Sequence, residues 1–114
     1  MSHVTRKTVI DPASIRPYDK LVVSYEDLEA VFGDPRPAAN GADVVWVVTF
    51  DDGLIAAVYN WRNGLNHLGP NAPPIHQLTN WTIAGTSRDC VHRIRNLLQR
   101  RQWSKAAARQ GRAR

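Results

Sequence analysis

The residue types best suited to chemistry gather between Tyr59 and Asn66, where aromatics, an arginine, a glycine and three asparagines follow one another. Aromatic rings can stack on a base, asparagine amides can pair with base or ribose edges, and arginine can hold phosphate oxygens. The segment therefore indicates a binding surface for a nucleotide-like ligand. Sheets also favour half-buried aromatics, so a structural interpretation stays open, with Trp61 filling core and Asn60 bonded to neighbouring loop backbone.

The predicted site extends into the strand and the helix that follow this segment. Thr86-Ser87 opens the helix, and a helix N-terminus favours anions. The predicted ligand-binding residues are Tyr59, Asn60, Trp61, Arg62, Asn63, Asn66, Trp81, Arg88 and Arg93.

Patterns typical of catalysis do not occur in the sequence. No nucleophile beside a base, carboxylate pair or phosphate-binding glycine motif stands at a telling spacing. His67 and His76 share one loop without the further ligands expected of zinc, and Asp51 and Asp52 fit a turn. We therefore predict a protein that is not an enzyme and that uses no metal and no cofactor.

Local patterns predict the elements that must position the site. Ser24, with an acid three residues later, predicts the start of a short helix, which Gly33 ends. Residues 44–50 and 54–59 are apolar runs around Asp52-Gly53 and predict a β-hairpin. A two-residue turn there would pair Phe50 with Ile55, Val48 with Ala57, Trp46 with Tyr59, Val47 with Val58, and Val45 with Asn60.

The second half of the chain predicts a loop, a strand and a long helix. Two glycines and three prolines break residues 62–77, and residues 81–84 alternate like a strand. Thr86 to Asp89 would cap a helix whose apolar row is Cys90, Val91, Ile94, Leu97 and Leu98.

Together these elements predict an α+β fold: a small antiparallel sheet built on the hairpin, a short N-terminal helix and a long C-terminal helix. We expect an irregular arm over 1–19, a single domain over 20–103 and a basic tail over 104–114. Because both hairpin faces are apolar, we also expect a homodimer or a higher homo-oligomer.

Length, cysteine use and charge limit the possible functions. The chain has 114 residues, one cysteine and no apolar run of transmembrane length or secretory type, so we expect a cytoplasmic protein without membrane contact. Residues 88–114 carry nine basic side chains and one acidic one, a net charge of +8, whereas residues 1–87 carry −3. The basic end is either a solvated terminus or a site that attracts phosphates.

Three motifs resemble those of a known family. They are Phe50-Asp51-Asp52-Gly53, then Val58-Tyr59-Asn60-Trp61-Arg62-Asn63-Gly64 with Asn66 and Leu68-Gly69, and Trp81-Thr82-Ile83-Ala84-Gly85. This order is similar to that of phage anti-Thoeris proteins of the first type, or of a wider set of small phage proteins with the same pattern. The resemblance covers about residues 22–99. Ala84, Thr86 and the basic extension after Gln99 depart from it.

The resemblance implies a phage counter-defence protein acting in the cytoplasm of an infected bacterial host. Such a protein is a sponge that sequesters a nucleotide-derived immune signal, a cyclic ADP-ribose isomer or a cyclic nucleotide, without turnover. The site residues would then divide by type, with the aromatics stacking, the asparagines reading base or ribose edges and the arginines holding the pyrophosphate.

Two other classes of function stay open. In a nucleic-acid-binding module, the basic helix would track a phosphate backbone and the aromatics would stack on unpaired bases. No recognised nucleic-acid motif accompanies that pattern. In an inhibitor of a host protein, the apolar sheet face would dock on the target.

Overall fold

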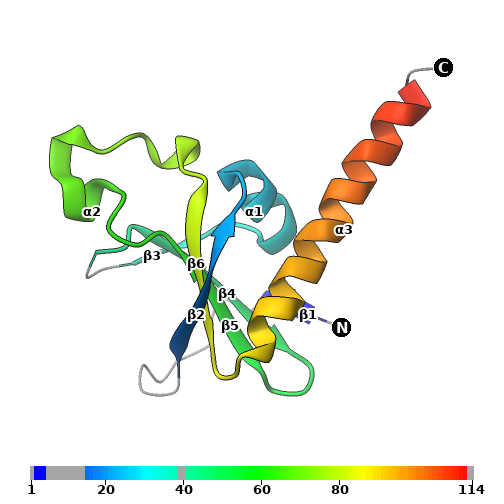
Figure 1. Cartoon of the computed structure of the whole chain (residues 1–114), viewed down its shortest axis with the longest axis horizontal. Helices are drawn as coiled ribbons and strands as arrows, with labels where there is room; N and C mark the ends of the chain where they lie inside the picture. Colours follow the sequence, from blue (N-terminus) through cyan, green and yellow to red (C-terminus); the bar gives the residue numbers. More distant parts are fainter. Residues whose placement is uncertain (1, 5–14, 39–40, 113–114) are drawn as a thin grey trace.

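The structure is a computed structural model that describes residues 2–4, 15–38 and 41–112 (Figure 1). Its elements are β1 (Ser2–Val4), β2 (Arg16–Val22), α1 (Tyr25–Phe32), β3 (Arg36–Pro37), β4 (Val44–Phe50), β5 (Ile55–Tyr59), α2 (Leu65–Leu68), the 3-10 turns η2 (Gly69–Asn71) and η3 (Ile75–Gln77), β6 (Asn80–Gly85) and α3 (Asp89–Arg112).

The strands form one antiparallel sheet in the order β1-β4-β5-β6-β2, and the short β3 also pairs with β4. The predicted α+β class is confirmed, with the hairpin β4–β5 at the centre of the sheet, a short helix α1 and a long helix α3. Ser24 caps α1, because its side chain accepts a hydrogen bond from the Asp27 N–H. Gly33 ends the helix with a φ of 85°, in the left-handed region.

The predicted register of the hairpin is wrong by one residue. Trp46 pairs with Val58, not with Tyr59, and Thr49 pairs with Ile55. The turn has three residues, since the Phe50 N–H donates to the Leu54 carbonyl at 2.9 Å and Gly53 adopts a φ of 89°. A type I turn followed by a left-handed glycine is the usual three-residue hairpin loop, and it adds the residue that shifts the pairing.

The predicted irregular arm contains two strands. Residues 2–4 pair with β4, and β2 pairs along the whole length of β6, so the sheet begins well before residue 20. At the other end, residues 104–112 continue helix α3, as Figure 1 shows. The described part of the predicted tail is therefore helical.

Helices α1 and α3 cover one face of the sheet. Leu28 and Phe32 of α1 and Cys90, Ile94 and Leu98 of α3 are buried in a single cluster with the inward side chains of the strands, which are Leu21, Trp46, Val48, Phe50, Ala56, Val58, Trp81 and Ile83. Trp46 and Trp81 meet edge to face with ring centroids 5.4 Å apart. Each donates its indole N–H to a backbone carbonyl, that of Gly33 and that of Val23 respectively.

The opposite face of the sheet is also covered at its centre. Val47, Ala57, Thr82 and Ala84 are each at most 5% exposed within one chain. An open apolar face was the reason to expect a second subunit, so this burial removes that reason. The homo-oligomer stays a prediction without that support.

Candidate functional site

Asn60 anchors the loop that follows β5. Its amide oxygen accepts the N–H groups of Asp43 at 2.8 Å and Val44 at 3.1 Å, and its Nδ2 donates to the Asp43 carboxylate at 3.2 Å. The side chain is 0% exposed. Asn60 therefore holds the loop in place, and the prediction that it reads a ligand edge is wrong because the amide has no accessible surface.

Gly64 completes this anchor. A Cβ at position 64 would overlap the Asp43 carboxylate, whose Oδ2 also accepts the Leu65 N–H at 2.8 Å, and would lie 2.6 Å from the Asn60 Nδ2. Only glycine fits at such a close approach. The spacing of Asn60 and Gly64 in the sequence is thus explained by the packing of both residues against Asp43.

The anchored loop presents Trp61 and Arg62 to solvent. Trp61 is 42% exposed and packs on Gly41, where a Cβ would lie 3.2 Å from the ring. Arg62 adopts a φ of 58°, which is strained for a residue other than glycine, and donates its backbone N–H to the Gly41 carbonyl at 2.8 Å. Its guanidinium lies 5.2 Å from the centre of the Trp61 ring, in a cation–π geometry. This backbone conformation fixes both side chains at the surface.

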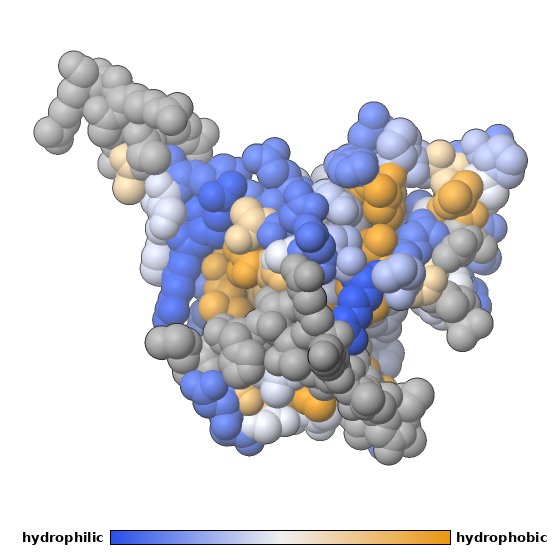
Figure 2. Space-filling model, turned by 180° about the vertical axis from the view of Figure 1, so that it is seen from behind, coloured by the Kyte–Doolittle hydropathy of each residue, from blue (hydrophilic) through white to orange (hydrophobic). Residues whose placement is uncertain are grey.

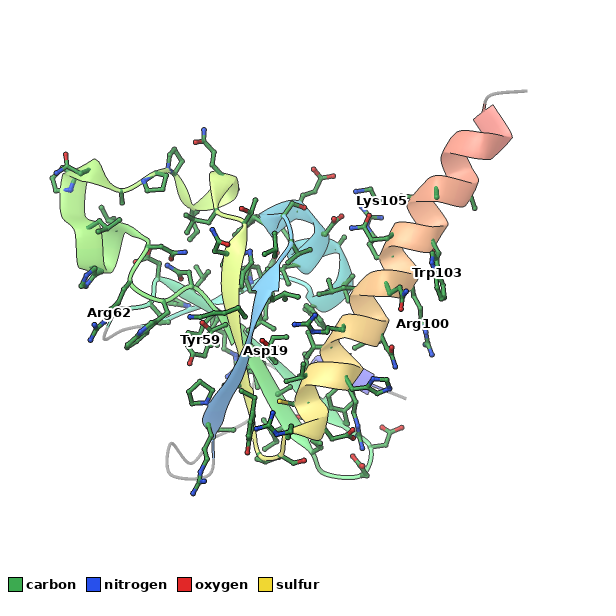
Figure 3. All side chains as sticks on the ribbon, in the orientation of Figure 1. Asp19, Tyr59, Arg62, Arg100, Trp103 and Lys105 are labelled. Carbon is green, nitrogen blue, oxygen red and sulfur yellow. The ribbon has the colours of Figure 1, made fainter. Side chains whose placement is uncertain are left out.

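Tyr59 lies beside this pair at the end of β5. Its ring meets that of Trp61 edge to face at 6.3 Å, and burial raises the pKa of its phenol. Figure 3 shows Tyr59 and Arg62 on the α2 side of the molecule, away from α3. Tyr59 is opposite Thr82 in the sheet, and Thr82 is opposite Lys20, so these three residues cross the sheet in one row.

The row leads into a hollow of about 290 Å³, which we call the Trp61 groove. The Lys20 ammonium lies 3.4 Å from the Thr82 hydroxyl. The Asn63 amide donates to the Asn80 carbonyl at 3.0 Å, while its buried Oδ1 has no hydrogen-bond partner. The groove is lined by Lys20, Trp61, Asn63, Asn80, Trp81 and Thr82.

Trp81 contributes little to this surface. It is 1% exposed, and its indole N–H is used by the Val23 carbonyl, so its ring is part of the core and forms only the floor of the groove. The prediction that it provides a stacking surface is therefore wrong. Asn66 belongs to α2, and its side chain lies outside the described part of the structure.

The two predicted helix arginines lie at the other end of the sheet. β5 runs from Ile55, whose N–H bonds the Thr86 hydroxyl at 3.1 Å, to Tyr59, a span of about 13 Å at the usual strand rise. Arg93 donates to both Asp52 oxygens at 2.8 and 2.6 Å and to Asp89 at 2.7 Å. Hydrogen bonds from Arg93 lower the pKa of Asp52 to about 2.

Arg93 is thus occupied in joining α3 to the hairpin turn, and a pyrophosphate would have to displace two carboxylates from it. Arg88 is exposed and lies 5.5 Å over the Tyr18 ring. The structure therefore brings together Tyr59, Trp61, Arg62 and Asn63, and separates Arg88 and Arg93 from them.

Lys20 and Thr82 are groove residues that the sequence analysis did not identify. Thr82 stands between Trp81 and Ile83, and successive side chains of a strand point to opposite faces of the sheet. With Trp81 and Ile83 in the core, this alternation puts Thr82 on the face opposite the core. Lys20 belongs to β2, whose residues 16–19 were predicted to be part of an irregular arm. In the described part of the chain, neither Lys20 nor Arg62 has a carboxylate partner.

Two larger hollows suit this ligand chemistry less well. One of about 460 Å³ is lined mainly by apolar side chains with Asp43, and its carboxylate would repel phosphate. The other, of about 570 Å³, lies beside the start of α3, where Arg95 is already paired with Asp19 at 2.8 Å. Of the three hollows, the Trp61 groove is the one with an exposed tryptophan ring, that of Trp61, together with Lys20, a cation without a carboxylate partner among the described residues. The hollow beside α3 instead holds Arg88 over the half-buried ring of Tyr18.

Two further classes of site were sought in the described residues. No group of three or more histidine, cysteine or acidic side chains there is placed to hold a metal ion. None of the described helices is both long and apolar enough to cross a membrane. Comparison of the chain with protein-family models, curated proteins and solved structures finds no match, so its family membership remains a prediction from the motifs.

Proposed function

We propose that this chain binds a nucleotide-derived anion at the Trp61 groove and releases it unchanged. The observation that carries the proposal is the exposed Trp61 ring beside Lys20 and Arg62, two cations without carboxylate partners among the described residues. A base would stack on Trp61 and its phosphates would meet Lys20 or Arg62, because tryptophan offers a flat face and the cations offer charge-assisted hydrogen bonds.

The size of the groove limits how the ligand binds. Its volume of about 290 Å³ is at the lower end of the range for small-molecule sites, which begins near 300 Å³. A cyclic dinucleotide or an ADP-ribose derivative would therefore place one base and ribose in the groove. The remainder would lie across Arg62 at the surface.

Binding without turnover fits the side chains present. Among the described lining residues of the groove, Lys20 is the one charged side chain, and the others are amides, a hydroxyl and two indoles. General acid–base catalysis draws mainly on histidine and carboxylate side chains, and none of these lines the groove in the described part of the chain. As a sponge for a nucleotide-derived immune signal in the cytoplasm of an infected bacterium, the protein would need only this capture.

The proposal is tested by thermal denaturation with ADP-ribose, cyclic ADP-ribose and cyclic dinucleotides. A ligand bound only by the folded protein adds about 2.7 kcal/mol of stability at 100 times its Kd, and we expect at least one of these compounds to raise the melting temperature. Chromatography after denaturation should recover that compound unchanged. The absence of a shift with every compound at millimolar concentration would refute nucleotide binding, and conversion of the compound would refute the sponge.

A further inference from the structure

The second half of α3 projects away from the body of the molecule (Figure 1). Leu98 is the last residue of the helix that belongs to the buried core. Beyond it, Arg101, Gln102 and Lys105 contact Asp27 of α1, on the side of the helix that faces the body. The other side of these turns is exposed as far as residue 107, and the coloured part of the helix in Figure 2, seen from behind, is largely hydrophilic.

The exposed side carries a tryptophan and an arginine. Trp103 is 63% exposed, and Arg100 lies one turn before it, so the two side chains are neighbours on the helix surface. Figure 3 shows both pointing away from the sheet, whereas Lys105 points toward α1. In the described part of the chain, Arg100 has no carboxylate partner.

The cations of α3 also differ between the side that faces the body and the exposed side. The inward cations are paired with carboxylates of the body, since Arg93 pairs with Asp52, Arg95 pairs with Asp19, and Arg101 and Lys105 share Asp27. Arg100 is left without such a pair, and the last turns add Arg109 and Arg112 to the sequence of the helix. The sequence from Gln99 to Arg112 therefore has basic residues, no acidic residue and one aromatic residue, Trp103.

We propose that this projecting half of α3 docks single-stranded nucleic acid, with Arg100 on a backbone phosphate and Trp103 stacked on an unpaired base. A basic surface attracts the phosphate backbone, and an exposed aromatic ring stacks on any base. A bilayer fits less well, because Trp103 is the only large apolar residue after Leu98 and a membrane-bound helix needs a broad apolar face. A second copy would place two cationic helices side by side.

The test measures binding of a fluorescein-labelled 20-nucleotide oligo-dT and of a 20-base-pair duplex by fluorescence anisotropy. Trp103→Ala should weaken binding of the single strand about fivefold or more, because one stacked base is lost. Arg100→Gln should weaken it and reduce the slope of log Kd against log salt by about 0.7, the value for one phosphate contact on a single strand.

Arg88→Gln is the matched control, because it removes one exposed positive charge at the end of the helix opposite the proposed surface. It should bind oligo-dT within twofold of the wild type, and thermal denaturation should show all three variants folded. Equal binding of single strand and duplex with no effect of Trp103→Ala would overturn the proposal, as would a loss with Arg88→Gln equal to that with Arg100→Gln. The same holds if no oligonucleotide binds at 50 mM salt and 100 µM protein.

Discussion

At the scale of one residue, Asn60 has a structural role although its residue type and position suggested ligand binding. Its amide accepts two backbone N–H groups and is fully buried, so Asn60→Ala leaves both donors unpaired. We expect the variant to lose about 2–3 kcal/mol of unfolding free energy, since each buried donor without a partner costs about 1–3 kcal/mol. Chemical denaturation measures this loss.

The matched control for this variant is Asn96→Ala on the exposed surface of α3. It removes the same amide from a solvated position, and its unfolding free energy should stay within about 0.5 kcal/mol of the wild type. If Asn60→Ala were as stable as Asn96→Ala, the loop would not depend on the Asn60 anchor.

Asp52 gives a second prediction at this scale. The hydrogen bonds from Arg93 hold its pKa at about 2, and Arg93→Gln should return that pKa toward the ordinary aspartate value near 4. Carbon NMR of the Asp52 carboxyl group during an acid titration measures the change. Arg88→Gln, which removes a charge outside this pair, should leave the titration as it is. An unchanged Asp52 pKa in Arg93→Gln would disprove the bidentate pair.

At the scale of elements, Asp27 joins α1 to α3. Burial alone would raise its pKa, but hydrogen bonds from Lys105, Gln102 and Arg101 outweigh the effect of burial and lower the pKa. A carboxyl whose folded-state pKa is lowered stabilises the fold above its unfolded pKa, near 4, and loses this contribution as the pH falls through the folded-state pKa. We expect Asp27→Asn to cost about 1–2 kcal/mol at pH 7 and much less at pH 2.

Urea unfolding of the wild type and Asp27→Asn between pH 7 and pH 2 measures this dependence. Glu26→Gln is the control, because Glu26 is an exposed acid in the same first turn of α1. Its difference from the wild type should stay small at every pH. A cost of Asp27→Asn that stayed constant down to pH 2 would contradict the role of the charged carboxylate.

The elements also show what the sequence can predict and what it cannot. Ser24 and Gly33 bounded α1, and the apolar row from Cys90 to Leu98 located the buried side of α3, because capping and helical period are local signals. β2 gave no such signal, since it is an edge strand with a proline, a break in register after Pro17 and Leu21 as its only buried residue.

The sequence predicted exposed residues of the candidate site, but it did not predict which polar side chains are buried or already paired. Trp61, Arg62 and Asn63 lie together as predicted. Asn60, however, is hydrogen-bonded to Asp43, which is 17 residues away and belongs to no recognisable sequence motif. The Asp52 carboxylate that occupies Arg93 is likewise 41 residues away. Such long-range contacts decide whether a polar side chain is available to a ligand, and a local pattern does not contain them.

At the scale of the whole molecule, the two exposed tryptophans belong to two separate surfaces. Trp61 follows the end of β5 and lines the groove, and its neighbour Arg62 lies on the α2 side of the molecule, whereas Trp103 lies on the projecting half of α3 (Figure 3). The acidic body and the basic helix are joined by ion pairs of Asp19, Asp27 and Asp52. This arrangement predicts that Trp103→Ala weakens binding of single strands and leaves nucleotide capture at the Trp61 groove intact.

The most direct test of the nucleotide-binding proposal is titration calorimetry with whichever of ADP-ribose, cyclic ADP-ribose and the cyclic dinucleotides most raises the melting temperature. This compound is titrated into the wild type, Trp61→Ala, Lys20→Met and Trp103→Ala. We predict micromolar binding to the wild type, a loss of about tenfold or more in Trp61→Ala and Lys20→Met, and a change below twofold in Trp103→Ala, with melting temperatures confirming that each variant is folded. No measurable binding to the wild type, or equal weakening by Trp61→Ala and Trp103→Ala, would contradict the assignment of the ligand to the Trp61 groove.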